Sequence, residues 1–341
     1  MTGDDALLRE LLAAYEHERW ELVNRSGAGT NNTTRFIRLD GQDYVVRRYE
    51  THRDAGKVRY EHAVLQALQT MQLSFHTPAP LLNKQGCSYT TLAASENKLA
   101  AIFTYAEGDN PSLERMDDIY AYGELTGALS AALSRIDVPL EPVYPPYYEI
   151  EASYPLCAGD ALRQFCTKPG APFAAQADKL SVIWTKFQAI RERLADLDSL
   201  PKQLVHGDLN RTNMLSGKDG RMKAVLDFEF TTLDVRAMEL AVAIQDIYDP
   251  AVPGEQMLGR AEQFMRGYAV HGELSPEEAR AIPLLMILRK FDVFLHFLSR
   301  YFDGVNDETL VMRFIGSLHE QLMSAEAGLL QLSGIIASFS E

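Results

Sequence analysis

Apolar positions change period along the first third of the chain, from the spacing of a helix face to the alternation of strands. Residues 4–20 carry apolar side chains at helical spacing, which predicts an amphipathic helix capped by Asp4 or Asp5. A second helix is predicted over 54–73. Short apolar runs between turn residues predict strands at 21–26, 33–39, 43–49, 81–89 and 98–105.

Beyond residue 105 the helical period dominates. It predicts helices at 116–136, 174–197, 233–248, 255–271, 275–301 and 307–328. Ser275 marks a clear helix start, because Pro276 and two acidic residues follow it. Asp234 is expected to cap the helix over 233–248.

Two segments of this second part leave alternatives open. Residues 137–172 are rich in proline, which excludes a long regular element. The segment either shapes a substrate site or is a packed surface excursion. Asp292, His296 and Arg300 recur at four-residue spacing on a predicted helix. They either line a substrate pocket or form a solvated face with local ion pairs.

The stretch 204–230 concentrates the candidate chemistry. His206-Gly207-Asp208-Leu209 follows an apolar pair, Asn213 stands five residues after Asp208, and Asp227 ends a second apolar run. Phosphoryl transfer needs an acceptor for the proton of the attacking hydroxyl and oxygen ligands for Mg²⁺. Asp208 suits the first role, and Asn213 and Asp227 suit the second. The alternative is a loop whose Asp and Asn side chains only cap turns.

These residues resemble the signature of kinase-fold catalysts, His-x-Asp-Leu-x-x-x-Asn followed by Asp-Phe. With Gly207 where protein kinases have arginine, the stretch is similar to the aminoglycoside phosphotransferase and choline kinase superfamily, which includes type II homoserine kinases. The segment 225–244 resembles the second motif of that group. The resemblance implies an α+β, protein-kinase-like fold. An N-lobe of residues 1–105 would hold an antiparallel sheet, and a mainly helical C-lobe would span 106–341.

The resemblance also implies ATP and Mg²⁺ as cofactors and assigns residues to the nucleotide. The glycine-containing loop between the first two strands would cover the phosphates, unless it is an ordinary hairpin turn. Residues 104–108 would form the hinge where adenine binds backbone groups. Arg47 aligns with the phosphate-binding lysine of the third strand, with Arg48 as the alternative register. Glu61 would pair with that cation, unless it is a solvated surface carboxylate. The implied nucleotide-binding set is Gly27, Gly29, Thr30, Asn31, Arg47, Glu61, Thr104 and Tyr105.

Composition narrows the class of partner. Of 341 residues, 46% are hydrophobic and 23% charged, which suits a globular protein with two lobes. The formal charge of −14 argues against nucleic acid as a partner. It either attracts a cationic small molecule or serves solubility. Three widely spaced cysteines suggest neither a zinc site nor a disulfide framework, and neither a secretory signal nor a membrane span is predicted. We expect a cytoplasmic protein, and a homodimer remains open.

The leading hypothesis is an ATP-dependent kinase that phosphorylates a hydroxyl of a small molecule. Homoserine is the first candidate substrate by resemblance, with choline or an aminoglycoside as alternatives. A pseudokinase with a binding or structural role is the competing hypothesis. Intact Asp208, Asn213 and Asp227 disfavour it, whereas the arginine at position 47 favours it. A protein kinase is disfavoured, because no Ala-Pro-Glu follows Asp227 and no activation loop fits before residue 234.

Overall fold

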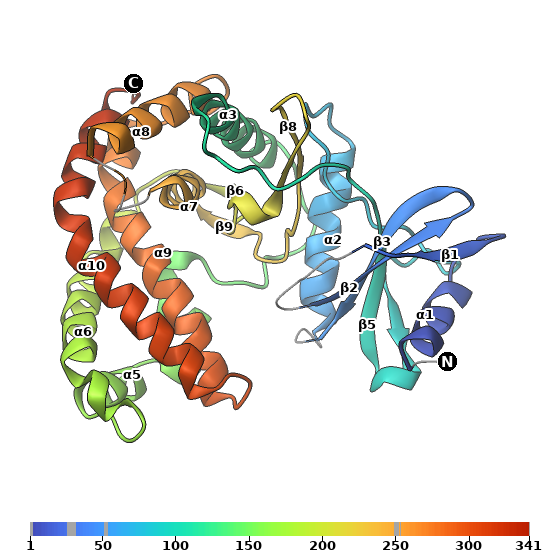
Figure 1. Ribbon diagram of the computed structural model, residues 1–341, viewed down its shortest axis with the longest axis horizontal. Helices are drawn as coiled ribbons and strands as arrows, with labels where there is room; N and C mark the ends of the chain where they lie inside the picture. The colour runs from blue at the N-terminus through green and yellow to red at the C-terminus, as the bar shows by residue number, and fades with distance from the viewer. Residues whose placement is uncertain (1–2, 26–31, 51–53, 249–251, 253, 341) are drawn as a thin grey trace. The chain divides into compact units, whose positions relative to one another are not determined.

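The computed structural model of this chain describes residues 3–25, 32–50, 54–248, 252 and 254–340 (Figure 1). It divides into two compact units, each assembled from three chain segments. The first unit holds residues 1–110, 135–143 and 213–231, and the second holds 111–134, 144–212 and 232–341. None of the helices within the described ranges is long and apolar enough to cross a membrane.

The first unit is built on a five-stranded antiparallel sheet in the order β1-β2-β3-β5-β4. Its strands are β1 (Trp20–Val23), β2 (Asn32–Leu39), β3 (Gln42–Tyr49), β4 (Thr90–Leu92) and β5 (Lys98–Thr104). Asp40 and Gly41 join β2 to β3 with φ of 49° and 92°, the left-handed pair that a two-residue hairpin turn needs. The predicted strands at 33–39 and 43–49 are therefore confirmed.

Helices α1 (Gly3–Ala13) and α2 (Ala55–Gln69) pack on this sheet (Figure 1). Leu11 and Leu12 of α1 join a buried core with Ile37 and Val46 of the sheet. Successive strand side chains point to opposite faces. Val46 therefore faces α1, and its neighbour in sequence faces the other side of the sheet.

The strand predicted over 81–89 is wrong, because the strand that pairs with β5 here is Thr90–Leu92 and residues 81–89 form no strand. The chain turns back at Asn83 instead. The Asn83 side chain accepts hydrogen bonds from the backbone N–H groups of Gln85 and Cys87, both at 3.0 Å. Gly86 lies in the left-handed region, with φ of 76°. A local turn of this kind competes with extension along a ladder.

The hairpin of β7 (Met214–Ser216) and β8 (Met222–Val225) also belongs to the first unit. Its outer edge bonds to His76, whose N–H donates to the Lys223 carbonyl at 2.8 Å. The Val225 N–H donates to the His76 carbonyl at 3.0 Å. These two hydrogen bonds to His76 fix the end of β8, which lies two residues before Asp227.

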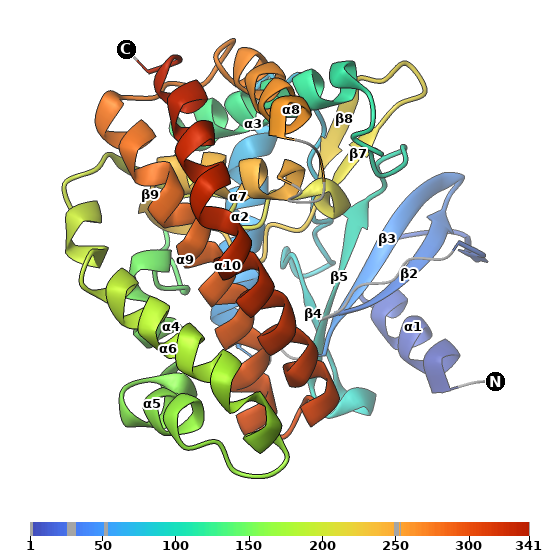
Figure 2. The ribbon, with the colours of Figure 1, turned by 60° about the vertical axis from the view of Figure 1, so that its left-hand side comes forward.

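The second unit is mainly helical. Its α-helices are α3 (Met116–Leu133), α4 (Ile150–Ser153), α5 (Asp160–Thr167), α6 (Ala177–Arg191), α7 (Ala237–Ile247), α8 (Gly254–Tyr268), α9 (Pro276–Phe302) and α10 (Glu308–Ala337). Helix α10 lies beside both α6 and α9 (Figure 2). Helices α3 and α8 pack closely because glycines without a Cβ face the neighbouring backbone. A Cβ on Gly123 would lie 2.0 Å from the Phe264 carbonyl oxygen, and one on Gly267 would lie 2.1 Å from that of Tyr120.

Helix boundaries agree with the sequence at several positions and differ at others. Ser275 caps α9 in a capping box with Glu278, as the sequence predicts. Helix α10 continues nine residues past the predicted end at 328, to Ala337.

Asp234 does not cap a helix, and that prediction is wrong. It lies in strand β9 (Thr232–Val235), which pairs with β6 (Lys202–Val205). Its buried carboxylate accepts hydrogen bonds from the N–H groups of Tyr147 and Val235. Long-range strand pairing therefore overrides the capping tendency of the residue.

Candidate active site

The loop after β6 carries Asp208, and buried side chains hold its backbone on both sides. The Glu239 carboxylate on α7 accepts a hydrogen bond from the His206 N–H. The Tyr122 hydroxyl on α3 donates to the Leu209 carbonyl at 2.8 Å. The Asp208 N–H itself donates to His206 Nδ1 at 3.2 Å. The backbone at Asp208 is thus fixed by two helices of the second unit.

The next turn of the loop is held by an ion pair to the far end of α7. Asp246 accepts from the Arg211 backbone N–H at 2.7 Å and from Arg211 Nε at 3.2 Å. The Asn210 side chain accepts from the Thr212 N–H at 2.9 Å. These contacts make a rigid loop of the kind that positions catalytic groups.

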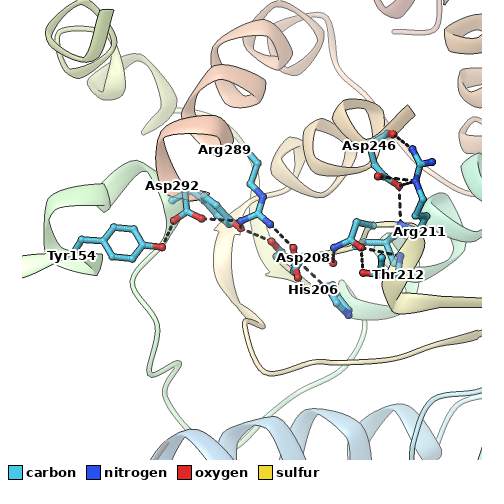
Figure 3. A network of polar contacts seen from close by, with 12 residues as sticks. Tyr154, His206, Asp208, Arg211, Thr212, Asp246, Arg289 and Asp292 are labelled. Atoms are coloured by element: carbon cyan, nitrogen blue, oxygen red, sulfur yellow. Dashed lines mark hydrogen bonds and ion pairs between the residues drawn. The ribbon is translucent and has the colours of Figure 1, made fainter. Parts of the chain in front are cut away.

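A polar network leads from Asp208 into α9 (Figure 3). Arg289 Nη2 forms an ion pair with Asp208, and Arg289 Nη1 forms a second one with Asp292 at 2.8 Å. The Tyr147 hydroxyl accepts from Arg289 Nη1 at 3.0 Å, and the Tyr154 hydroxyl donates to Asp292 at 2.6 Å. The Arg289, Asp208 and Asp292 side chains are 17%, 20% and 13% exposed, so all three ionic groups are largely removed from water.

Burial shapes the protonation of this network. It raises the pKa values of Tyr147 and Tyr154 well above the ordinary value, so both phenols remain protonated donors. It also raises the pKa of Asp292, although Arg289 and Tyr154 oppose the shift. One guanidinium thus serves two carboxylates, and the formal charges of these three groups sum to −1.

In the first unit, Arg47 joins two carboxylates. Its Nη1 lies 2.8 Å from Glu61 Oε1 on α2 and 3.3 Å from Asp227 Oδ1. The Tyr49 hydroxyl donates to the other Glu61 oxygen at 3.1 Å. Burial raises the pKa of Glu61 to about 7, even though Arg47 acts in the opposite direction. Because Glu61 is only 3% exposed, the alternative of a solvated surface carboxylate is wrong.

The neighbouring arginine lies on the other face of the sheet. Arg48 pairs with Glu50 at 2.7 Å, and Glu50 also binds Lys98. Arg47, not Arg48, therefore stands beside Glu61 and Asp227. A contact of Arg47 with phosphate remains a prediction.

Two features of Asp227 bear on its predicted role as a metal ligand. Its backbone lies in the left-handed region, with φ of 63°, which is uncommon for a residue other than glycine. Its Oδ1 is buried and makes no hydrogen bond within the described residues, although it lies 3.3 Å from Arg47 Nη1 in an ion pair. The Asn213 carbonyl accepts from the N–H of Leu226, at 2.8 Å, so Asn213 lies next to the turn that carries Asp227.

The donor set in this turn fits Mg²⁺ that is bound together with a nucleotide. Asp227 and Asn213 offer hard oxygen ligands, and Glu229 lies nearby, bonded to Asn32 at 3.0 Å. Within the described ranges no cluster of three or more His, Cys, Asp or Glu is arranged to hold a metal ion. Two side-chain ligands with phosphate and water are the usual arrangement for Mg²⁺.

The other predicted nucleotide-binding residues divide into two groups. Gly27, Gly29, Thr30 and Asn31 lie outside the described residues. Thr104 ends β5, and its hydroxyl accepts from the Ala79 N–H at 2.9 Å. The Tyr105 ring packs edge-on against Phe36 and lies beneath Arg25, 4.3 Å from its guanidinium carbon. Adenine binding at 104–108 remains a prediction.

Sequence reasoning missed several residues of the Asp208 network. Arg289, Tyr147 and Tyr154 were not identified, although Arg289 stands one helical turn before Asp292. His296 of the proposed row also faces this network, because its ring lies edge-on to that of Tyr154 at 6.3 Å.

Arg300, the third member of the row, makes a different contact. Its Nε lies 3.5 Å from the Asn306 side chain beyond the end of α9. The row therefore divides, and its first two members contact Tyr154 of the proline-rich segment.

Comparisons with known proteins identify the family of the chain. The family model described as "Phosphotransferase enzyme family" matches residues 23–274. A homoserine kinase of Gluconacetobacter diazotrophicus is 25% identical over 289 residues, 82% of each chain.

Two solved structures share the fold. A microcompartment-associated aminopropanol kinase has a TM-score of 0.69 at 19% identity, covering 95% of this chain and 98% of the other. An amicoumacin kinase in complex with AMP-PNP and Ca²⁺ has a TM-score of 0.64 at 16% identity, covering 93% of both chains. These likenesses confirm the α+β, protein-kinase-like fold class. The chain belongs to the phosphotransferase enzyme family, and it is a small-molecule kinase.

Proposed function

We propose that this kinase transfers the γ-phosphate of ATP to the hydroxyl of a small amino alcohol, with homoserine as the first candidate. The homoserine kinases that match this chain cover about four fifths of it, which supports that choice. The ion pairs that join Arg47 to Glu61 and Asp227 carry the proposal. They support it because kinases use a third-strand cation paired with a helix glutamate, next to a metal-binding aspartate, to hold the phosphates and the metal.

Each side chain then has one task. Asp208 accepts the proton of the substrate hydroxyl while the hydroxyl oxygen bonds to the γ-phosphorus and the bond from that phosphorus to the leaving ADP breaks. Arg47, held by Glu61, binds phosphate oxygens through its charged fork. Asn213 and Asp227 would hold Mg²⁺, which neutralises the charge that develops on the phosphates. Glu239 and Tyr122 keep the backbone at Asp208 in place.

The test is a panel assay of ADP release with homoserine, choline, ethanolamine and aminoglycosides, followed by the variant Asp208→Asn. We expect one substrate class to be turned over. Asp208→Asn should lower kcat by about 10²–10⁴-fold, which is the usual contribution of a general base. ATP affinity should stay within about threefold, because the proposed base contacts the hydroxyl rather than the nucleotide.

Asp219→Asn is the matched control, since Asp219 is an exposed residue of the same stretch and pairs only locally with Lys223. It should retain wild-type turnover. Turnover of the confirmed substrate by Asp208→Asn at the wild-type rate would exclude Asp208 as the base. Absence of turnover with every compound of the panel would contradict the proposed substrate class.

A further inference from the structure

The base proposed for the reaction is bound to a cation that the reaction does not need. Arg289 donates through Nη2 to Asp208, and the two side chains are 17% and 20% exposed. A carboxylate oxygen whose lone pairs accept from a guanidinium is less available to a substrate hydroxyl. The ion pair also stabilises the ionised form of Asp208, so Asp208 becomes a stronger base when the pair with Arg289 is weakened.

Removing Arg289 from Asp208 has a cost unless another anion replaces it. Arg289 would keep its ion pair with Asp292, but the largely buried N–H donors of Nη2 would lose their acceptor, which costs free energy. Asp292 and Tyr147 already bind Nη1 and give no second replacement. The replacement must come from the ligand.

A carboxylate is the group that fits this requirement. A guanidinium carries five N–H donors in a rigid fork that binds carboxylates bidentately. In Arg289 the described residues provide partners for Nη1 and Nη2, and none is assigned to Nε. The Nε–Nη2 edge is therefore the side on which a substrate carboxylate would bind, in competition with Asp208 for Nη2.

The same network offers a place for an ammonium group. Asp292 lies one turn along α9, accepts from Tyr154, and leaves the cluster with a formal charge of −1. That charge alone would attract any cationic amino alcohol. Such a cation gives Arg289 no anion in exchange for Asp208, whereas a zwitterionic amino acid provides both charges.

We propose that Arg289 is a specificity-determining residue, which binds the carboxylate of a hydroxy amino acid and thereby releases Asp208 to act as the base. This inference rests on the proposed function and narrows it. The substrate class is a hydroxyl-bearing α-amino acid rather than a simple amino alcohol. Tyr147 and Tyr154 bring the segment before α5 into substrate recognition.

The test compares two substrates that differ only in the carboxylate. L-homoserine and 3-aminopropan-1-ol have the same hydroxyl, the same chain and the same amine. For the wild-type enzyme we expect kcat/KM to be at least about 10²-fold higher for homoserine, since a site built to bind a polar group discriminates strongly against its absence. Arg289→Ala should lower the homoserine value by about 10²-fold or more. The aminopropanol value should fall much less, because that substrate has no carboxylate for Arg289 to bind, so the ratio between the two substrates should fall toward one.

Two further variants separate recognition from folding. Arg280→Ala removes an exposed arginine of the same helix that pairs with Glu277, and it should keep the wild-type ratio. Arg289→Lys keeps the charge and loses the fork, so it should give an intermediate ratio even if Arg289→Ala fails to fold. A variant that lowers both substrates equally would show a structural role and overturn the proposal. Wild-type preference for aminopropanol would overturn it as well.

Failure of the proposed function has a different signature. If the wild-type enzyme turns over no compound of the panel, the proposed function is wrong, and calorimetry with L-homoserine decides the inference. Binding that is about tenfold or more weaker in Arg289→Lys than in the wild type would support a carboxylate site at Arg289. Equal binding in both proteins, or no binding to the wild type, would overturn it.

Discussion

Glu239 provides a test of how strongly the interior of the second unit controls the catalytic loop. Its carboxylate is fully buried on α7, accepts from the His206 N–H through Oε2, and has no partner for Oε1 among the described residues. Burial raises its pKa to about 7, from an ordinary value of 4.5, although interactions with the backbone N–H groups of His206 and Gly207 oppose the shift. We predict that the variant Glu239→Gln gains stability relative to the wild type as the pH rises.

The sign follows from the raised pKa. The folded state binds the proton more tightly than the unfolded state, so this contribution to stability is complete below the unfolded value of 4.5 and is lost as pH rises through about 7. Between about pH 5 and about pH 8 the wild type should therefore lose about 2–3 kcal/mol relative to Glu239→Gln, at about 1.4 kcal/mol per pKa unit. The amide has no such titration. The cost of burying the amide is the same at both pH values, so it cancels when the stability gap at one pH is subtracted from the gap at the other.

Thermal unfolding measured across this pH range is the assay. The gap in Tm between the variant and the wild type should change by roughly 5–10 °C in favour of the variant, for a unit of about 200 residues. Glu262→Gln, on α8 and paired with Arg266, controls for loss of an exposed charge. Other buried acids such as Asp234 titrate in both proteins and drop out of the comparison. A gap that does not vary with pH would refute the reasoning, because it would mean that the buried carboxylate is well solvated.

Three further predictions follow from single contacts. Arg47→Ala should raise the KM for ATP and lower kcat, Glu61→Ala should do so more mildly, and the double mutant should be non-additive because both side chains belong to one ion-pair network; additive effects in steady-state kinetics would argue against that coupling. Calorimetry should show weak Mg²⁺ binding to the apo protein and tight binding with ATP, because Asn213 and Asp227 supply only two side-chain ligands; equal affinity in both states would contradict their assignment. Ser275→Ala should lower the free energy of unfolding by about 1 kcal/mol through loss of the α9 capping box, and an unchanged denaturation midpoint would count against the box.

The sequence predicted features that depend on neighbouring residues, such as the faces of β3 and the start of α9. The alternation of side chains along β3 left two registers open for the phosphate-binding arginine, and the burial of Val46 against α1 decides between them. The start of α9 followed from Ser275 and the residues after it, because a capping box needs only four neighbouring positions.

Long-range contacts account for what the sequence did not disclose. Asp234 has the composition of a helix cap, yet it pairs in a strand with residues about 30 positions earlier. Arg289 meets Asp208 across 81 positions, and nothing in the local pattern of α9 distinguishes it from an arginine on a solvated face. Tyr147 and Tyr154 lie in a segment whose prolines predicted only irregularity. Their roles depend on which helix the segment contacts.

The division of the chain into alternating segments has a consequence for its synthesis. The sheet of the first unit is complete at residue 104, but the hairpin that bonds to His76 is made only when residues 214–225 have left the ribosome. At about 5–20 residues per second, that interval lasts on the order of 10 s. During this time the backbone edge at His76 lacks its partner, and a nascent chain must keep that edge from pairing with another molecule. Slower translation between residues 110 and 213 would prolong this exposure without changing the finished protein.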